Sequence, residues 1–175
     1  MKPQKIKHKK PVRKAKYWLK EGLKFIVIIT LFSLAVDYWR SQDMPKQAIP
    51  PLVTTTIKGD WVDIEKMSHE APVLLYFWAT WCPVCEFVSP SVDWLSSDHQ
   101  VVSIAITSGE DERLNQFMKH KEYNFSVIND DKGAISQQWG VTATPSIFIV
   151  KNGEVSSITT GATTPMGLWL RLLFA

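Results

Sequence analysis

The chain has 175 residues, of which 45 % are hydrophobic and 21 % are charged. This composition excludes a disordered or low-complexity chain, and the length fits one domain plus a short extra element but not two ordinary domains. The net charge of +3 is unevenly divided, because residues 1–24 hold ten Lys or Arg and one acidic residue, whereas the remainder is net negative.

A basic and then apolar region opens the chain. Residues 1–16 form a basic arm, and the run Phe25–Val36 that follows after a short interval contains twelve residues and no charge. Aromatic pairs flank this run, so that residues 17–39 are long enough to cross about 30 Å of hydrocarbon as one transmembrane helix. The excess of Lys and Arg in the arm predicts a cytoplasmic N-terminus and an extracytoplasmic location for everything after residue 39.

Other interpretations of this region stay open. A cleaved signal peptide has the same basic-then-apolar order, and Ser33-Leu34-Ala35 offers a small-x-small cleavage site, although this site lies inside the apolar run. A buried core helix is a further alternative. A basic arm can also bind nucleic acid, but a membrane flank already accounts for the charge, so we predict no nucleic-acid partner.

The rest of the chain shows the alternation of strands and helices that is typical of an α/β domain. Residues 40–51, which contain three prolines, are predicted to be a linker, and residues 52–175 the domain. The run 72–79 is continuously apolar, which indicates a central strand buried on both faces. The pattern further predicts a hairpin at 53–57 with 61–62, strands at 100–107 and 125–128, a hairpin at 146–150 with 154–160, and helices at 64–67, 83–95, 110–121, 130–139 and 166–174. We therefore expect a sheet with parallel crossovers and an antiparallel edge pair.

The two cysteines of the chain, Cys82 and Cys85, are separated by two residues and directly follow the predicted central strand. At the first turn of a helix this spacing places both sulfurs on one face, within bonding reach. The helix N-terminus stabilises a thiolate at Cys82, Pro83 suits the first turn, and Cys85 is positioned to resolve a mixed disulfide. The pattern favours a redox-active pair over half a zinc site, an inert structural disulfide or a Cu(I) site. The four histidines form no motif with the pair, so no metal site is predicted.

The segment from Val73 to Cys85 resembles the active-site strand and helix start of the thioredoxin superfamily, and its Phe-Trp-Ala-Thr-Trp-Cys stretch is most similar to the membrane-anchored TlpA/DsbE-like branch. Pro90 matches the proline that bends the family's active-site helix, Thr144-Pro145 its cis-proline loop, and Lys151-Asn152-Gly153 its edge turn. Within this branch, the short anchor and the Cys-Pro-Val-Cys site resemble the suppressor of copper sensitivity protein D type. The resemblance implies a thioredoxin-like three-layer α/β/α fold with a mixed central sheet, preceded by one N-terminal transmembrane helix.

The resemblance also implies roles for the residues around the pair. Cys82 and Cys85 are expected to be the catalytic residues and to form the disulfide. The Thr144-Pro145 loop is expected to bind an extended substrate segment as an added strand. Three neighbours of the cysteines are expected to support the site: Trp81, Pro83 and Val84.

Two positions depart from the family pattern. Tyr76 stands where many thioredoxins carry a buried Asp that assists proton transfer, and Ser146 stands where cytochrome-maturation relatives often carry an acidic residue. The general base stays unassigned, since Glu86, the nearest carboxylate in sequence, is expected to be solvated. Trp78 is expected in the core and Trp81 at the rim of the site, and the other tryptophans of the domain are expected to serve packing: Trp61, Trp94, Trp139 and Trp169.

Together these features predict a thiol–disulfide oxidoreductase tethered to the bacterial inner membrane, with its catalytic domain in the periplasm and no cofactor. Its expected partners are protein thiols and disulfides and a DsbD-like membrane electron donor, and the branch resemblance favours a reductase. Three alternatives stay open: an oxidant of DsbA-like direction, a membrane-tethered copper-binding protein without turnover, and a non-catalytic thioredoxin-fold adaptor.

Overall fold

The computed structural model describes residues 21, 22, 24, 28 and 48–175. The chain divides into two compact units, Met1–Trp39 and Arg40–Ala175. The predicted arm at 1–16, most of the predicted anchor at 17–39 and the linker up to residue 47 lie outside the described residues.

Four residues of the first unit are described. All four are helical, and Lys24 Nζ lies 2.9 Å from Glu21 Oε1. Among the residues that the structure describes, no helix has both the length and the apolar character needed to cross a membrane.

The second unit is built on a five-stranded mixed sheet with the strand order β5-β4-β3-β6-β7. Strand β3 pairs in parallel with β4, and β4 with β5, whereas β6 and β7 each run antiparallel to their neighbour. A separate two-stranded hairpin, β1–β2, precedes the sheet in the chain. The strands are β1 (Val53–Thr55), β2 (Trp61–Asp63), β3 (Val73–Trp78), β4 (Gln100–Ile106), β5 (Ser126–Asp130), β6 (Ser146–Lys151) and β7 (Glu154–Thr160).

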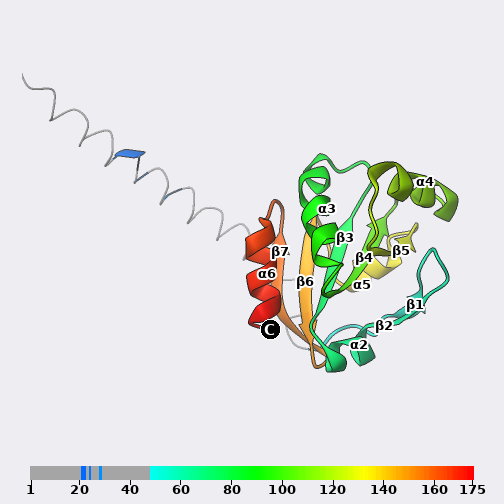
Figure 1. The fold of residues 1–175 in the computed structure, drawn as a ribbon, viewed down its shortest axis with the longest axis horizontal. Helices are drawn as coiled ribbons and strands as arrows, with labels where there is room; N and C mark the ends of the chain where they lie inside the picture. Colours follow the sequence, from blue (N-terminus) through cyan, green and yellow to red (C-terminus); the bar gives the residue numbers. More distant parts are fainter. Residues whose placement is uncertain (1–20, 23, 25–27, 29–47) are drawn as a thin grey trace, which may run out of the picture. The chain divides into compact units, whose positions relative to one another are not determined.

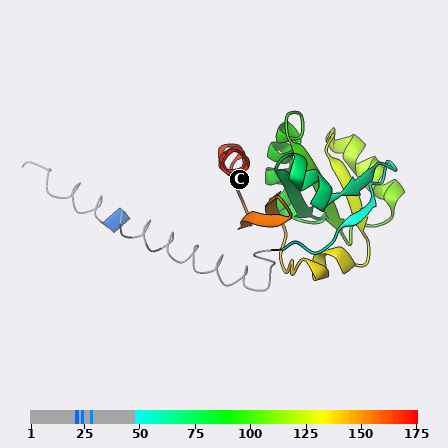
Figure 2. The ribbon, with the colours of Figure 1, turned by 90° about the horizontal axis from the view of Figure 1, so that it is seen from below.

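Helices cover both faces of this sheet, which gives the predicted α/β/α layers (Figures 1 and 2). Buried residues of α3, α4 and α6 pack against one face, and residues of α2 and α5 against the other. Strand β3 is buried along its whole length, because Leu74, Tyr76 and Trp78 point to the first layer while Phe77 and its alternate neighbours point to the second. The helices are α2 (Ile64–Glu70), α3 (Pro83–Leu95), α4 (Asp111–Lys121), α5 (Ala134–Gln138) and α6 (Pro165–Leu173).

The two ends of the domain are attached to opposite edges of the sheet. The hairpin β1–β2 reaches β5, where Ile57 N donates to Val127 O at 2.9 Å. At the other edge, α6 lies next to β7 (Figure 1), and Leu168 and Leu172 are buried in the same core cluster as α3. The turn between β6 and β7 has positive φ at Asn152 and Gly153, as the Asn-Gly pair predicts for a hairpin.

The chain differs from the sequence prediction after β5. A helix was expected from Asp130, yet Asp130 ends the strand and α5 begins at Ala134. The carboxylate of Asp130 is buried and accepts hydrogen bonds from Ile135 N at 3.0 Å and Ser136 N at 2.8 Å. Asp130 therefore satisfies amides at the start of the short helix from a position outside it.

The tryptophans also divide differently from the prediction. Trp78 and Trp139 are buried, as expected, and Trp139 packs between Phe77 and Phe148. Trp61 and Trp94, however, are 71 % and 57 % exposed, so the prediction that they serve packing is wrong for these two, and Trp169, at 37 % exposed, packs only in part. Trp61 lies in a two-stranded hairpin, where a side chain that points away from the domain has no layer to cover it.

Candidate functional site

The cysteine pair lies where the central strand passes into α3. Cys82 is the N-cap of this helix, with extended backbone angles of φ −93° and ψ 109°, and Pro83 occupies the first helical turn. Cys85 N donates to Cys82 Sγ at 3.2 Å, so the sulfur takes the place that a Ser or Asp oxygen usually has at an N-cap. The two cysteines form a disulfide with a Cα–Cα distance of 5.3 Å. When Cys82 is reduced, the same amide and the helix dipole stabilise its thiolate.

Both sulfur-bearing residues are nearly buried, while their neighbours are not. Cys82 and Cys85 are 4 % and 1 % exposed, which fits Cys85 as the more shielded of the two. Cys82 lines a shallow hollow of about 170 Å³ together with Thr80, Trp81, Pro83 and Glu86, through which a partner can approach.

Three large hydrophobic side chains are exposed around this site. Trp81 is 62 % exposed, as expected for a rim residue, and Val84 is 39 % exposed. Phe87, which the sequence analysis did not single out, is 82 % exposed and lies on the same face of α3 as Val84, three residues further on. The sequence could have indicated Phe87, because it is an apolar residue at a position of the helix that lies outside the helical pattern of buried residues. Val84 and Phe87 therefore form an exposed apolar strip on α3 next to the cysteines.

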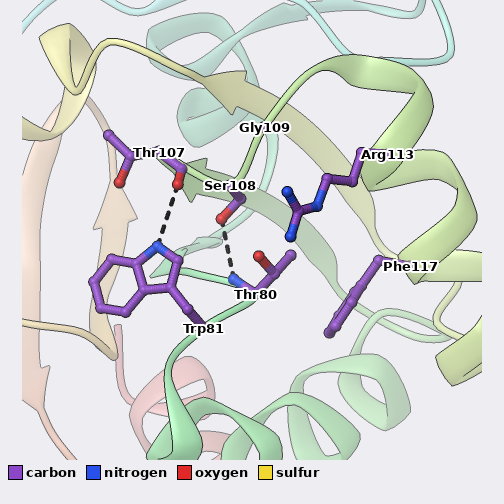
Figure 3. Close-up of a pocket in the computed structure, with 7 residues that line it drawn as sticks. All are labelled: Thr80, Trp81, Thr107, Ser108, Gly109, Arg113 and Phe117. Carbon is purple, nitrogen blue, oxygen red and sulfur yellow. Dashed lines mark hydrogen bonds between the residues drawn. The ribbon is translucent and has the colours of Figure 1, made fainter.

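The loop before Cys82 is fixed by the loop that follows β4. Thr80 N donates to Ser108 Oγ at 3.0 Å, and Ser108 Oγ in turn donates to Ile106 O at 2.9 Å. Trp81 Nε1 donates to Thr107 O at 3.2 Å, so that the rim tryptophan is held by a hydrogen bond despite its exposure (Figure 3). The site thus stands on the carboxyl ends of two adjacent parallel strands, β3 and β4.

The loop of Thr144 and Pro145 lies at the same end of the sheet. The bond between these two residues is cis, and strand β6 begins immediately after it at Ser146. Ser146 pairs with Phe77, near the end of β3 that leads to Cys82, and its hydroxyl donates to Ala143 O at 2.8 Å. The register therefore brings the loop to the end of the sheet where the cysteines lie.

A tyrosine occupies the inner side of the site where many thioredoxins carry an acid. Tyr76 OH lies 3.0 Å from Ser89 Oγ and 3.4 Å from Cys85 O, and all three residues are buried. Burial raises the pKa of the Tyr76 phenol above its ordinary value of 10, an effect that the hydrogen bond with Ser89 only partly offsets. The phenol stays protonated at neutral pH, so Tyr76 does not replace the acid as a base.

A small cavity of about 10 Å³, the size of about one water molecule, adjoins both cysteines and Ser89, the hydrogen-bond partner of Tyr76. Among the described residues that line this cavity, Glu86 has the one carboxylate. This side chain is 57 % exposed and lies 3.1 Å from Lys121 Nζ, consistent with the expectation that it is solvated. The cavity is lined by Trp78, Ala79, Thr80, Cys82, Cys85, Glu86, Ser89, Phe117 and Tyr123.

Two thiols are the soft metal ligands that the site itself offers. Within residues 48–175 and the four described N-terminal residues, no group of three or more His, Cys, Asp or Glu side chains could hold a metal ion. The structure brings together Cys82, Cys85 and their sequence neighbours, and the Thr144–Pro145 loop starts the strand beside them.

Comparisons with known proteins agree with this geometry. A family model described as the AhpC/TSA family matches residues 45–158. The chain is 33 % identical over 163 residues to a "Thioredoxin-like protein" of Haemophilus influenzae, which covers 93 % of this chain and 97 % of that protein. It is 30 % identical over 151 residues to "Thiol-disulfide oxidoreductase ResA" of Bacillus thuringiensis, which covers 78 % of this chain and 86 % of the relative.

Solved structures share the fold at lower identity. A secreted Mycobacterium tuberculosis disulfide oxidoreductase homologous to DsbE superposes with a TM-score of 0.61 at 24 % identity, covering 71 % of this chain and 96 % of that one. StoA from Bacillus subtilis superposes with a TM-score of 0.63 at 22 % identity, covering 71 % of this chain and 98 % of that one. These likenesses establish the thioredoxin-like arrangement of the domain.

Proposed function

This chain belongs to the AhpC/TSA family and is a thiol–disulfide oxidoreductase of the DsbE/ResA type, and from this premise we propose that it reduces disulfides of protein partners in the periplasm while tethered to the inner membrane. The observation that carries the proposal is the hydrogen bond from Cys85 N to Cys82 Sγ at the N-terminus of α3. A thiolate at this position is stabilised both by the amide and by the helix dipole, which makes Cys82 the attacking sulfur.

The reaction is thiol–disulfide exchange in two displacements. The Cys82 thiolate attacks one sulfur of the partner disulfide, whose S–S bond breaks and releases the other sulfur as a thiolate. Cys85 then loses its proton and attacks Cys82 in the mixed disulfide, which frees the second partner sulfur and forms the Cys82–Cys85 disulfide. Two electrons have passed to the partner, and a DsbD-like membrane donor returns two electrons to the pair.

The surroundings of the pair support these roles. The hollow over Cys82 admits a partner sulfur, whereas Cys85 is buried and its backbone carbonyl accepts a hydrogen bond from Tyr76 OH. The backbone of Thr144, held by the following cis-proline at the end of β6, is proposed to pair with an extended segment of the partner. Trp81 and Val84 add exposed apolar surface on which that partner packs.

The basic arm and the apolar run at 25–36 support the proposed tether. They form a flank and a core of the kind that retains a single-pass helix with a cytoplasmic N-terminus. The location is tested in intact cells, where a membrane-impermeant maleimide should label the cysteines of the reduced full-length protein. Labelling only after lysis would contradict the proposed orientation.

The direction of electron flow is tested by the reduction potential of the Cys82–Cys85 pair in the full-length chain, equilibrated against glutathione buffers. A reductant fed by a membrane donor is expected near the potential of thioredoxin, about −270 mV. A potential near that of DsbA, about −120 mV, would make the protein an oxidant. If no reversible couple were found, the proposed exchange reaction would be excluded and Cu(I) binding by the dithiol would be measured next.

A further inference from the structure

Next to the cysteine site lies a larger pocket of about 510 Å³, which the reaction described above does not use. Its walls come from the loop before Cys82, the loop after β4 and the first turns of α4. It shares Trp81 and Thr80 with the hollow over Cys82, so a group bound in it lies beside the reacting sulfurs. We call it the Arg113 pocket, and it is lined by Thr80, Trp81, Ser108, Gly109, Arg113 and Phe117, together with the backbone at residue 107.

The one charged side chain of the pocket is Arg113. Figure 3 shows its guanidinium reaching from α4 into the pocket, toward Thr80 and Ser108, with the ring of Phe117 below it and Trp81 across the opening. No carboxylate among the described residues lies within ion-pair distance of Arg113, whereas the nearby Lys121 is paired with Glu86. Of the acidic residues directly before Arg113 in the chain, Asp111 accepts a hydrogen bond from Asn129 Nδ2 at 2.7 Å and Glu112 accepts one from Gln116 Nε2 at 3.1 Å. The guanidinium therefore has its donors available for a ligand.

The loop that precedes α4 leaves room for the Arg113 side chain because it has a glycine at residue 109. Gly109 has φ +96°, and a Cβ at this position would lie 2.8 Å from Arg113 Cδ. Asn129 Nδ2 also donates to Gly109 O at 3.0 Å, and Thr107 N donates to Asp130 O at 3.0 Å, so both ends of the loop are anchored to β5. The pocket is thus held open by backbone conformation and by hydrogen bonds that do not involve its ligand.

We propose that the Arg113 pocket binds a carboxylate side chain of the partner polypeptide, close in sequence to the partner's reactive cysteine. This inference rests on the proposed function, since it names the chemistry of the partner that the same site acts on. A guanidinium binds a carboxylate through two parallel hydrogen bonds, which fixes orientation as well as charge. The aromatic rings of Trp81 and Phe117 cover the aliphatic part of the same Asp or Glu side chain and the adjoining backbone.

The net charge of the domain does not by itself favour an acidic partner. Outside the N-terminal 24 residues the chain carries 16 acidic against 10 basic residues, so its overall field repels an acidic partner. Arg113 is the one charged side chain that lines the pocket, so removal of its charge should abolish the preference for an acidic segment there.

The test uses reduced full-length protein in detergent micelles and two disulfide-bonded peptides that differ only by Glu or Gln two residues from the cysteine. The second-order rate constant of exchange should be about three- to tenfold higher for the Glu peptide at low salt, the range of a partly solvated bidentate pair. Arg113→Gln should bring this ratio to one, and high salt should narrow it in the wild-type protein. Lys119→Gln, which removes the same charge from an exposed position of α4 outside the pocket, should leave the ratio unchanged.

An uncharged small disulfide, hydroxyethyl disulfide, distinguishes a failure of the exchange reaction from a failure of the carboxylate pocket. Its rate reports the sulfur chemistry without any carboxylate, so the peptide rates of each protein are divided by it, and any change that Arg113→Gln makes in the reactivity of the Cys82 thiolate cancels. Failure of every variant to reduce any disulfide would overturn the proposed function itself. Equal rates with the Glu and Gln peptides in the wild-type protein, or an equal loss with both in Arg113→Gln, would overturn the carboxylate pocket while leaving the exchange reaction in place.

Discussion

Replacing Tyr76 by phenylalanine removes one hydroxyl from the layer beneath the cysteines and leaves the ring. The ring packs beside Trp78 and edge-on to Phe125, with centroid distances of 6.2 Å to each, and these contacts persist in Y76F. The hydroxyl lies 3.0 Å from Ser89 Oγ, which is 1 % exposed and would lose this partner. Loss of one hydrogen bond, with a buried hydroxyl left behind, should lower the free energy of unfolding by about 1–2 kcal/mol at pH 7.

The same substitution has a predictable pH dependence. Burial raises the pKa of Tyr76 in the folded protein above its unfolded value of about 10, so the folded state favours the protonated phenol. The stability that this residue contributes is fully present below pH 10 and is lost as the pH rises toward the folded pKa, by about 1.4 kcal/mol at pH 11. The disadvantage of Y76F should therefore shrink to roughly zero between pH 9 and pH 11.

The assay is urea unfolding of the oxidised full-length chain in detergent, followed by tryptophan fluorescence at pH 7, 9 and 11. Y123F is the matched control, because Tyr123 also has its pKa raised by burial but is the more exposed of the two. A cost of Y76F below about 0.3 kcal/mol at pH 7, or a cost that stays constant to pH 11, would refute the reasoning from burial and hydrogen bonding.

Three other substitutions test separate parts of the site and fold. C85S should trap a stable mixed disulfide with a partner peptide, because the resolving sulfur is absent, whereas C82S should trap none. Non-reducing gels distinguish the two variants. Equal trapping by both would contradict the assigned order of attack. D130A should lower the free energy of unfolding by about 2–4 kcal/mol, because a buried carboxylate that accepts from Ile135 N and Ser136 N is lost, while D131A at the exposed neighbouring position should change it by less than about 0.5 kcal/mol in the same urea assay. G109A should cost about 1–2 kcal/mol and should weaken any preference for acidic peptides, because alanine disfavours φ +96° and its Cβ collides with Arg113; full stability in thermal unfolding would show that the loop adapts.

The main features of the fold could be predicted from the sequence because they depend on local patterns. The continuous apolar run of β3, the Asn-Gly turn before β7 and the cysteine spacing each report a property of a few adjacent residues. The resemblance added the cis bond at Pro145, which the structure contains. The three-layer arrangement of the second unit is confirmed, whereas the predicted transmembrane helix lies largely outside the described residues.

What could not be predicted depends on how distant segments meet. The exposure of Trp61 and Trp94 follows from which element faces them, and an apolar residue type carries no information about that. The Arg113 pocket joins a loop after β3, a loop after β4 and helix α4, so no single stretch of sequence contains it. Asp130 looked like a helix start because its carboxylate does satisfy helical amides, but it does so five and six residues ahead, from the end of a strand.

The hydrogen bond at the start of α3 also bears on how little the protein must rearrange during turnover. Its donor is the backbone amide of Cys85, which the helix holds in place, and its acceptor is the sulfur that alternates between disulfide and thiolate. Because the donor is a backbone amide within the helix, its position does not depend on a bond between the two sulfurs. A hydrogen-bond donor for the charged sulfur is therefore in place before the charge forms. The backbone amide of the resolving cysteine thus keeps the reorganisation energy of exchange low.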